Sequence, residues 1–220
     1  MLMRYEIKFP IFFDKINILN QWLDSLRAVK LHHENRLVNS IYYDDDDYNC
    51  AIDNINGISD RKKYRIRWYN NNKKKFQYEI KIKKNKLSNK IIFEPKNPIN
   101  FENYNKLFEI NSSNFDLQNK NLKYINCYNL KPNLKISYIR KYLIYENKIR
   151  ITVDENLNFT NFHKNNLHKV KKDNINILEI KFDESNYNEA LYLIKNCYFT
   201  PKRFSKYLRG LALHGLANYL

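Results

Sequence analysis

Glycine is scarce in this chain, with only 3 residues among 220. Glycine-rich loops of the G-x-x-x-x-G-K-[ST] or G-x-G-x-x-G type are missing, so a nucleotide would have to be held by side chains. Cysteine is also rare, because the chain has only Cys50, Cys127 and Cys197. Their odd number and wide spacing exclude a disulfide framework and a cysteine-based zinc site, and this usage is typical of a reducing cytoplasm.

Long apolar runs are missing as well. No stretch reaches the roughly 18 residues that a transmembrane helix needs, and the first residues resemble a strand rather than a signal peptide. We therefore expect a cytoplasmic protein without a spanning helix. Hydrophobic residues still make up 43% of the chain, which is enough for one sizeable core. Because no repeat or linker divides the sequence, it predicts a single domain over residues 1–220.

Positive charge is what the chain has in excess. The formal net charge is +16, which predicts an anionic partner such as nucleic acid, anionic lipid or phosphate. The chain is also rich in Asn, Ile and Tyr, so part of the lysine excess reflects a compositional bias on the solvated surface. Arginine is more informative, because five arginines fall inside predicted strands: Arg36, Arg65, Arg67, Arg140 and Arg150.

Hydrophobic periodicity predicts both strands and helices. Strands are expected at residues 3–9, 36–44, 62–69, 75–83, 134–145, 150–154 and 177–183. Helices are expected at residues 15–29 with Asp14 as the cap, at residues 188–198, and from about residue 203 to the end. The Asn-rich residues 97–133 predict only short helices and loops.

Several predicted strands alternate apolar residues with charged ones, as Lys63, Arg65 and Arg67 do with their neighbours. Successive side chains of a strand point to opposite faces, so each such strand has one apolar and one charged face. One interpretation is an antiparallel sheet with a solvated charged face. The other is a barrel with its charged faces inward, since crowded cations on adjacent strands need a polyanion or metal to compensate them.

Nine segments carry a resemblance to a known family, and they occur in family order over nearly the whole chain. They are Arg4-Tyr-Glu-Ile-Lys8, Arg36 through Ser40-Ile-Tyr-Tyr-Asp44, Arg65-Ile-Arg-Trp-Tyr69, Glu79-Ile-Lys81, Ser88-Asn-Lys90, Ile139-Arg-Lys-Tyr142, Arg150-Ile-Thr-Val-Asp154, Leu178-Glu-Ile-Lys181 and Phe204-Ser-Lys206. The chain resembles the polyphosphate polymerase domain of vacuolar transporter chaperone (VTC) proteins, in the CYTH-like triphosphate tunnel metalloenzyme superfamily. This resemblance implies an α+β fold: a closed antiparallel β-barrel tunnel of about eight strands with helices packed outside.

The resemblance also implies a reaction, in which the γ-phosphoryl group of ATP is added to a growing polyphosphate chain. It implies catalytic roles for basic residues along the tunnel, namely Arg65, Arg67, Lys81, Arg140, Arg150 and Lys206. The implied substrate-binding residues are Lys8, Arg36, Lys90, Lys181 and Ser205. A divalent metal, Mn²⁺ or Mg²⁺, would be held by Glu179 and Glu6, whereas Glu79 is expected to be an ion-pair partner.

Other interpretations remain open at this point. Tunnel enzymes that hydrolyse thiamine triphosphate or make cyclic AMP begin with Glu-x-Glu-x-Lys, but Arg4 occupies the first of these positions here. A tunnel triphosphatase acting on inorganic or nucleoside triphosphate is an alternative, because the sequence does not show whether water or a phosphate chain attacks. A non-enzymatic nucleic-acid binder is the third interpretation, but no nucleic-acid partner is expected without a recognition motif. By family analogy, a separate membrane protein would hold the chain at the membrane periphery.

Overall fold

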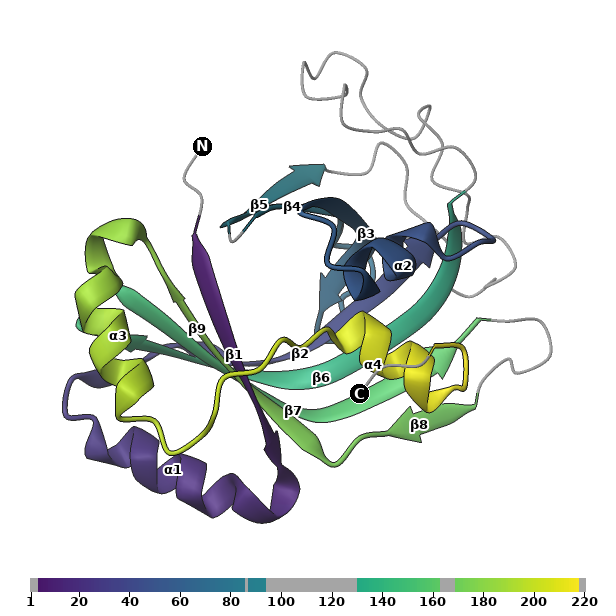
Figure 1. The fold of residues 1–220 in the computed structure, drawn as a ribbon. Coiled ribbons are helices and arrows are strands. Elements are labelled where there is room, and N and C mark those ends of the chain that lie inside the picture. The colour runs from purple at the N-terminus through teal and green to yellow at the C-terminus, as the bar shows by residue number, and fades with distance from the viewer. Residues whose placement is uncertain (1–3, 86, 94–129, 163–168, 218–220) are drawn as a thin grey trace.

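A computed structural model describes residues 4–85, 87–93, 130–162 and 169–217 (Figure 1). One antiparallel sheet contains nine strands: β1 (Tyr5–Phe12), β2 (Val29–Asp44), β3 (Asp60–Tyr69), β4 (Phe76–Lys84), β5 (Leu87–Phe93), β6 (Lys131–Tyr145), β7 (Ile149–Asn161), β8 (Val170–Lys172) and β9 (Ile175–Phe182). The helices are α1 (Ile16–Ser25), α2 (Asn49–Ile55), α3 (Tyr187–Lys195) and α4 (Lys206–Leu213), with 3₁₀ turns at Phe13–Lys15 and Glu184–Asn186. In these ranges, no helix is long and apolar enough to cross a membrane.

The neighbour order in the sheet is β1-β9-β7-β6-β2-β3-β4-β5, and β8 lies beside β7. The prediction of a closed barrel is not confirmed, because no described ladder joins the edge strands β1 and β5. They approach each other through an isolated antiparallel bridge between Arg4 and Ser88. The α+β class and the large antiparallel sheet are confirmed.

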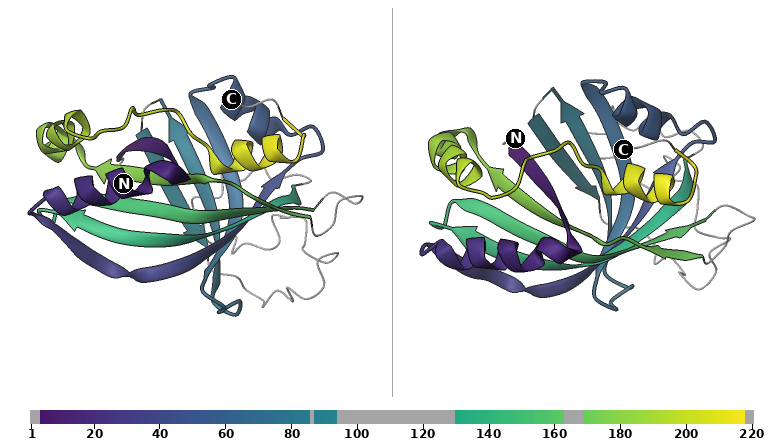
Figure 2. Two further views of the ribbon diagram at one scale, coloured as in Figure 1. Left: turned by 90° about the horizontal axis from the view of Figure 1, so that it is seen from below. Right: turned by 60° about the horizontal axis from the view of Figure 1, so that its bottom comes forward.

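The outer face of β1, β7 and β9 is apolar and is covered by two helices. Leu19 and Trp22 of α1 and Leu193 of α3 pack there against strand residues such as Phe9 and Ile180. Figures 1 and 2 show α1 and α3 at one end of the sheet, and α2 and α4 at the other. Packing this face against helices leaves the opposite, charged face of the same strands turned inward.

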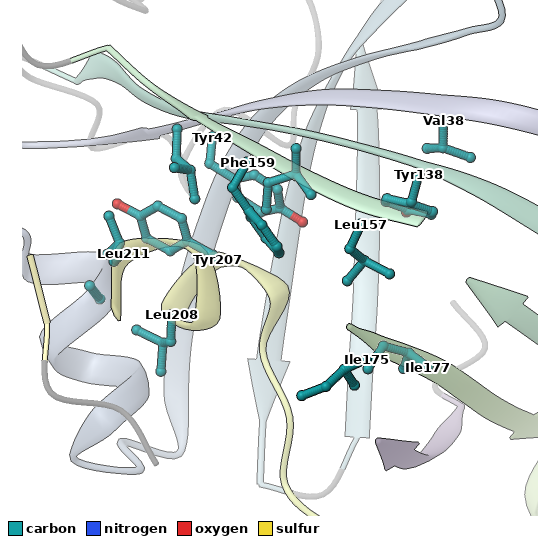
Figure 3. Close-up of a cluster of buried hydrophobic side chains, with 13 residues drawn as sticks. Val38, Tyr42, Tyr138, Leu157, Phe159, Ile175, Ile177, Tyr207, Leu208 and Leu211 are labelled. Carbon is teal, nitrogen blue, oxygen red and sulfur yellow. The ribbon is translucent and has the colours of Figure 1, made fainter. Parts of the chain in front are cut away.

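Helix α4 packs on the inner side of the sheet, beside the charged residues. A β-bulge in the β6–β7 pair, between Ser137 and Ile139, changes which residues of β7 face inward. As a result, Phe159 lies on the inner side, where it packs in one cluster with Leu208 and Leu211 of α4 (Figure 3). This apolar contact fixes the start of α4 next to the charged part of the face.

Gly210 is the point of closest approach between α4 and the sheet. A Cβ atom there would clash with Cδ2 of Leu134 and would lie 2.5 Å from Cδ1 of Phe159, and both of these side chains are fully buried. We expect Gly210→Ala to lower the free energy of unfolding by about 1–3 kcal/mol through overpacking. Ala212→Ser, at a half-buried position of α4, should stay within about 0.5 kcal/mol. Chemical denaturation of both variants measures this, and an unchanged midpoint for Gly210→Ala would contradict the packing.

Several element predictions need correction. Asp14 does not cap a helix but lies within a 3₁₀ turn, and α1 begins at Ile16 and ends at Ser25. The last helix begins at Lys206 rather than near residue 203 and ends at Leu213. Strands β5 and β8 and helix α2 were not predicted, because they are short and their alternation is weak. Of the predicted irregular region, residues 97–129 lie outside the described residues, and β6 begins already at Lys131.

Candidate phosphate-binding site

The charged face of the sheet encloses a cavity of about 100 Å³, here called the inner pocket. Two carboxylates line it, Glu6 and Glu179, together with three tyrosines and the hydroxyl-bearing Ser205. The described lining also includes eight cationic side chains: Lys8, Lys63, Arg65, Arg67, Lys81, Arg140, Lys181 and Lys206. Such an excess of cations around a small enclosed volume attracts a compact polyanion.

Strand register brings these residues together from across the sheet. Lys8 of β1 lies opposite Glu179 of β9, and Arg65 of β3 lies opposite Glu79 of β4. Arg140 of β6 lies opposite Asp154 of β7. Directly opposite residues share a face, so each pairing places a cation beside a carboxylate on the inner side.

Glu79 anchors the arginines of β3. Its Oε2 accepts from Nε of Arg65 at 2.6 Å and lies 3.8 Å from Nη1 of Arg67, while its Oε1 accepts from Nζ of Lys90 at 2.9 Å. Burial opposes ionisation of Glu79, but Arg65 and Arg67 outweigh it and hold the pKa of this carboxyl far below its usual value. The predicted ion-pair role of Glu79 is therefore confirmed, and it orients Arg65 and Arg67 toward the inner pocket.

Asp154 is a second, fully buried anchor. Its Oδ2 accepts from Nη2 of Arg140 at 2.7 Å and lies 2.6 Å from Nζ of Lys206. Lys206 also lies 3.3 Å from Oε1 of Glu179, and Lys181 lies 2.8 Å from Oε2 of that residue. Burial raises the pKa of Glu179, but the adjacent Lys181 and Lys206 hold it well below its ordinary value.

Glu6 and Glu179 share their lysine partners. Nζ of Lys8 lies 3.0 Å from Oε1 of Glu6 and 3.8 Å from Oε1 of Glu179, and Lys181 also contacts both carboxylates. Glu6 in turn accepts from Nζ of Lys81 at 2.9 Å. Burial lowers the pKa of Lys81 to about 8, although Glu6 favours its charged form.

The carboxylates of the inner pocket determine how a divalent metal could be held there. Within the described ranges no group of three or more acidic, His or Cys side chains forms a protein-only metal cage. Mg²⁺ and similar ions are nevertheless commonly held by one or two carboxylates together with substrate phosphates and water. Glu179 and Glu6 fit that second mode, since both are ionised and lie on one wall of the inner pocket.

The chain segment before α4 borders the inner pocket. Ser205 caps α4 by accepting from the backbone N–H of Leu208, and its Oγ also accepts from Nζ of Lys63 at 2.9 Å. Nζ of Lys8 donates to the carbonyl oxygen of Phe204 at 3.1 Å. These contacts hold Ser205 and Lys206 against β1 and β3.

Ten of the residues singled out in the sequence line the inner pocket, and three do not. Those in the pocket are Glu6, Lys8, Arg65, Arg67, Lys81, Arg140, Glu179, Lys181, Ser205 and Lys206. Arg150 is exposed and lines another cavity of about 390 Å³, which shares Lys181 with the inner pocket. Arg36 is exposed over the rings of Tyr69 and Tyr142, and Lys90 forms an ion pair with Glu79.

Sequence reasoning missed Lys63, Asp154 and the tyrosines of the pocket. Lys63 carried the same alternation signal as Arg65 and Arg67, and Asp154 the same signal as Arg150. Tyr138 lies beneath two cations, with its ring centre 5.0 Å from Nζ of Lys206 and 5.3 Å from Cζ of Arg140. Such cation–π contacts support the cations before any ligand arrives.

A larger cavity of about 510 Å³, here called the outer cavity, adjoins the inner pocket. Five residues line both spaces: Glu6, Lys8, Lys63, Lys81 and Ser205. The outer cavity adds further cations, including Arg61, Lys83, Lys202 and Arg203. Positive charge therefore continues from the enclosed site toward solvent.

Two solved structures share the fold of this chain. A candidate adenylate cyclase from Vibrio parahaemolyticus is 10% identical, with 94% of this chain and 98% of that chain covered and a TM-score of 0.51. A chain of the Schizosaccharomyces pombe Mediator head module is 9% identical, with 92% and 99% covered and a TM-score of 0.51. A protein of Pyrococcus horikoshii OT3 is 16% identical over 96% and 99% of the chains, with a TM-score of 0.49.

The solved structures with a TM-score above 0.5 show a shared fold and no more, given their low identity. No curated protein matches the chain. The family model described as "VTC domain" matches residues 3–214, which is nearly the whole chain. The chain therefore belongs to the VTC domain family.

Proposed function

We propose that this protein is an ATP-dependent polyphosphate polymerase, which transfers the γ-phosphoryl group of ATP to a growing polyphosphate chain. The observation that carries the proposal is the inner pocket, where eight cations face two carboxylates in about 100 Å³. Its arginines are preoriented by Glu79 and Asp154, in a chain of the VTC domain family. A compact polyphosphate anion would complete the charge balance of this pocket.

The chemistry suits such a pocket. Phosphoryl transfer needs in-line positioning and neutralisation of charge on the equatorial oxygens more than it needs covalent help. Arg65, Arg67 and Arg140 would grip phosphate oxygens through their guanidinium forks, while Lys8 and Lys206 supply point charges. The attacking oxygen of a polyphosphate end is already anionic, so the reaction requires no general base.

A divalent metal, Mn²⁺ or Mg²⁺, is part of the proposal. Glu179 would hold it, with Glu6 as a second contact, after their lysine partners have turned to the phosphates. The metal would neutralise charge on phosphate oxygens when bound. The ion pairs of Glu179 with Lys181 and Lys206 keep this carboxylate ionised and in place until then.

We also propose that the sheet closes around the bound chain as a tunnel. The Arg4–Ser88 bridge and the ion pair between Glu6 and Lys81, at 2.9 Å, already link the strands on either side of the gap between β1 and β5. A polyanion that contacts Lys8 of β1 and Lys81 of β4 would add attraction across the same gap.

Incubation of the purified protein with ATP and Mn²⁺ tests the proposal. We expect ADP and long-chain polyphosphate, detected by gel electrophoresis, and loss of both on chelation of the metal. Release of inorganic phosphate without polymer would instead support the triphosphatase alternative, in which water attacks the same bound triphosphate. The absence of any turnover or triphosphate binding would overturn both.

A further inference from the structure

Lys63 differs from every other cation of the inner pocket. Within the described part of the chain, each of the other seven lies within 4.0 Å of a carboxylate oxygen. Lys63 has no such carboxylate, and its Nζ instead donates to Oγ of Ser205 at 2.9 Å. Its counter-charge is therefore missing from the described structure.

Other cations surround Lys63 and add to the excess of positive charge around it. Lys8 faces it from β1, Lys81 from β4, and Arg61 and Arg65 flank it on β3. Burial and then these cations lower the pKa of Lys63 well below its ordinary value. Like charges on neighbouring strands are destabilising, so this arrangement costs stability until an anion arrives.

The remaining charged groups near Lys63 do not compensate it. Among the described residues, Glu6 is the one carboxylate common to the linings of the two cavities, and it is already contacted by Lys8 and Lys81. Beside Ser205, the segment before α4 adds two further cations to the outer cavity, Lys202 and Arg203. Helix α2 contributes only the amide of Asn54 to this lining.

Lys63 lies where the inner pocket meets the outer cavity. Its side chain lines both the inner pocket and the outer cavity, so a linear phosphate chain extending from one to the other must pass it. A phosphate oxygen at this junction would replace the missing carboxylate. It would also favour the charged ammonium, which can form a charge-assisted hydrogen bond.

We propose that Lys63 is a substrate-binding residue that takes up a proton when it engages a phosphate at the junction, so that polyanion binding is coupled to pH. This inference rests on polyanion binding in the proposed function, and it holds whether water or a phosphate chain then attacks. Binding should weaken as pH rises, because the free protein then holds Lys63 neutral. One linked proton changes affinity by at most tenfold per pH unit.

Inorganic tripolyphosphate without added metal is the probe, measured by titration calorimetry between about pH 7 and 9.5 in buffers of different ionisation enthalpy. Tripolyphosphate itself also exchanges protons. The number of protons taken up on binding is therefore compared between the wild type and each variant. We expect Lys63→Arg, which stays charged, to take up fewer protons than the wild type by up to one. The affinity of Lys63→Arg for tripolyphosphate, relative to the affinity of the wild type, should rise with pH. Lys62→Arg, the neighbouring position on the other face of β3, is the matched control and should behave as the wild type.

Lys63→Met separates a binding role from a structural one. Removal of a buried amine that has no carboxylate partner among the described residues should raise the melting temperature of the free protein, whereas it should weaken tripolyphosphate binding about tenfold or more. A lower melting temperature with unchanged affinity would overturn the inference. Equal proton uptake by the wild type and Lys63→Arg would overturn it too, while leaving the proposed function intact. Failure of the wild type to bind tripolyphosphate would overturn both.

Discussion

Replacing Arg65 and Arg67 together with alanine is expected to abolish both phosphoryl transfer and the stabilisation of the protein by triphosphate. Each guanidinium would supply charge-assisted hydrogen bonds of about 1.5–3 kcal/mol to the ligand. Loss of both therefore corresponds to a fall on the order of 10²–10⁴-fold in kcat/KM. In the wild type, tripolyphosphate should raise the melting temperature, because it binds only the folded state. The double variant should show no such shift.

The double variant also has a structural cost that must be separated from its effect on the ligand. Glu79 is nearly fully buried and would keep only Lys90 as an ion-pair partner among the described residues, so the free protein should be destabilised as well. Adding Glu79→Gln should restore much of that stability, since an amide has no charge to leave unpaired. It should not restore the shift with tripolyphosphate. Arg27→Ala, exposed just beyond α1, is the control. A full shift in the triple variant would show that Arg65 and Arg67 do not bind phosphate.

The alternation on β3 was enough to find the charged face. Tyr64, Ile66 and Trp68 pack in one apolar cluster, and Lys63, Arg65 and Arg67 turn to the opposite side, as a two-residue period requires. Most elements with a strong period were likewise predicted, with errors at their ends. The reason is that this period depends only on local backbone geometry.

Which charged residues meet in the pocket could not be predicted from the sequence. Arg150 and Asp154 lie on one face of β7, but strands rise about 3.3 Å per residue, so roughly 13 Å separates them. Register with the neighbouring strands decides that Asp154 lies opposite Arg140 whereas Arg150 lies opposite Lys181. The missing partner of Lys63 is likewise a property of register. Neither feature leaves a signal in a single sequence.

The inward position of α4 was also beyond sequence reasoning. It depends on the bulge between β6 and β7, which turns Phe159 to the same side as Arg140. A bulge adds one residue and reverses the alternation downstream, so a strict two-residue period assigns that part of β7 to the wrong face. Lys206 could be identified from the resemblance, but its contact with Asp154 depends on this reversal.

Asp154→Asn should cause the largest loss of stability among single changes at the site. Asp154 is fully buried and forms two hydrogen bonds with Arg140 and an ion pair with Lys206. Asparagine keeps the shape but removes the charge, which leaves two buried cations without their main partner. Breaking a buried pair in this way costs about 3–5 kcal/mol of unfolding free energy, measurable by denaturant titration. Asp46→Asn, at an exposed pair with Lys131, should cost less than about 1 kcal/mol.

Two further measurements on Asp154→Asn test the role of this residue: the pH dependence of stability and the stabilisation by tripolyphosphate. Burial raises the pKa of Asp154, but Arg140 and Lys206 outweigh it and lower the pKa in the folded protein. Its stabilising effect is therefore present above the unfolded pKa and is lost as pH falls through the folded value, so wild type and Asp154→Asn should converge in acid. At neutral pH, tripolyphosphate should stabilise Asp154→Asn more than the wild type, because the ligand then supplies the missing negative charge to Arg140 and Lys206. A smaller shift in the variant would mean that the orientation of these cations by Asp154 contributes more to ligand binding than the negative charge of Asp154 takes from it.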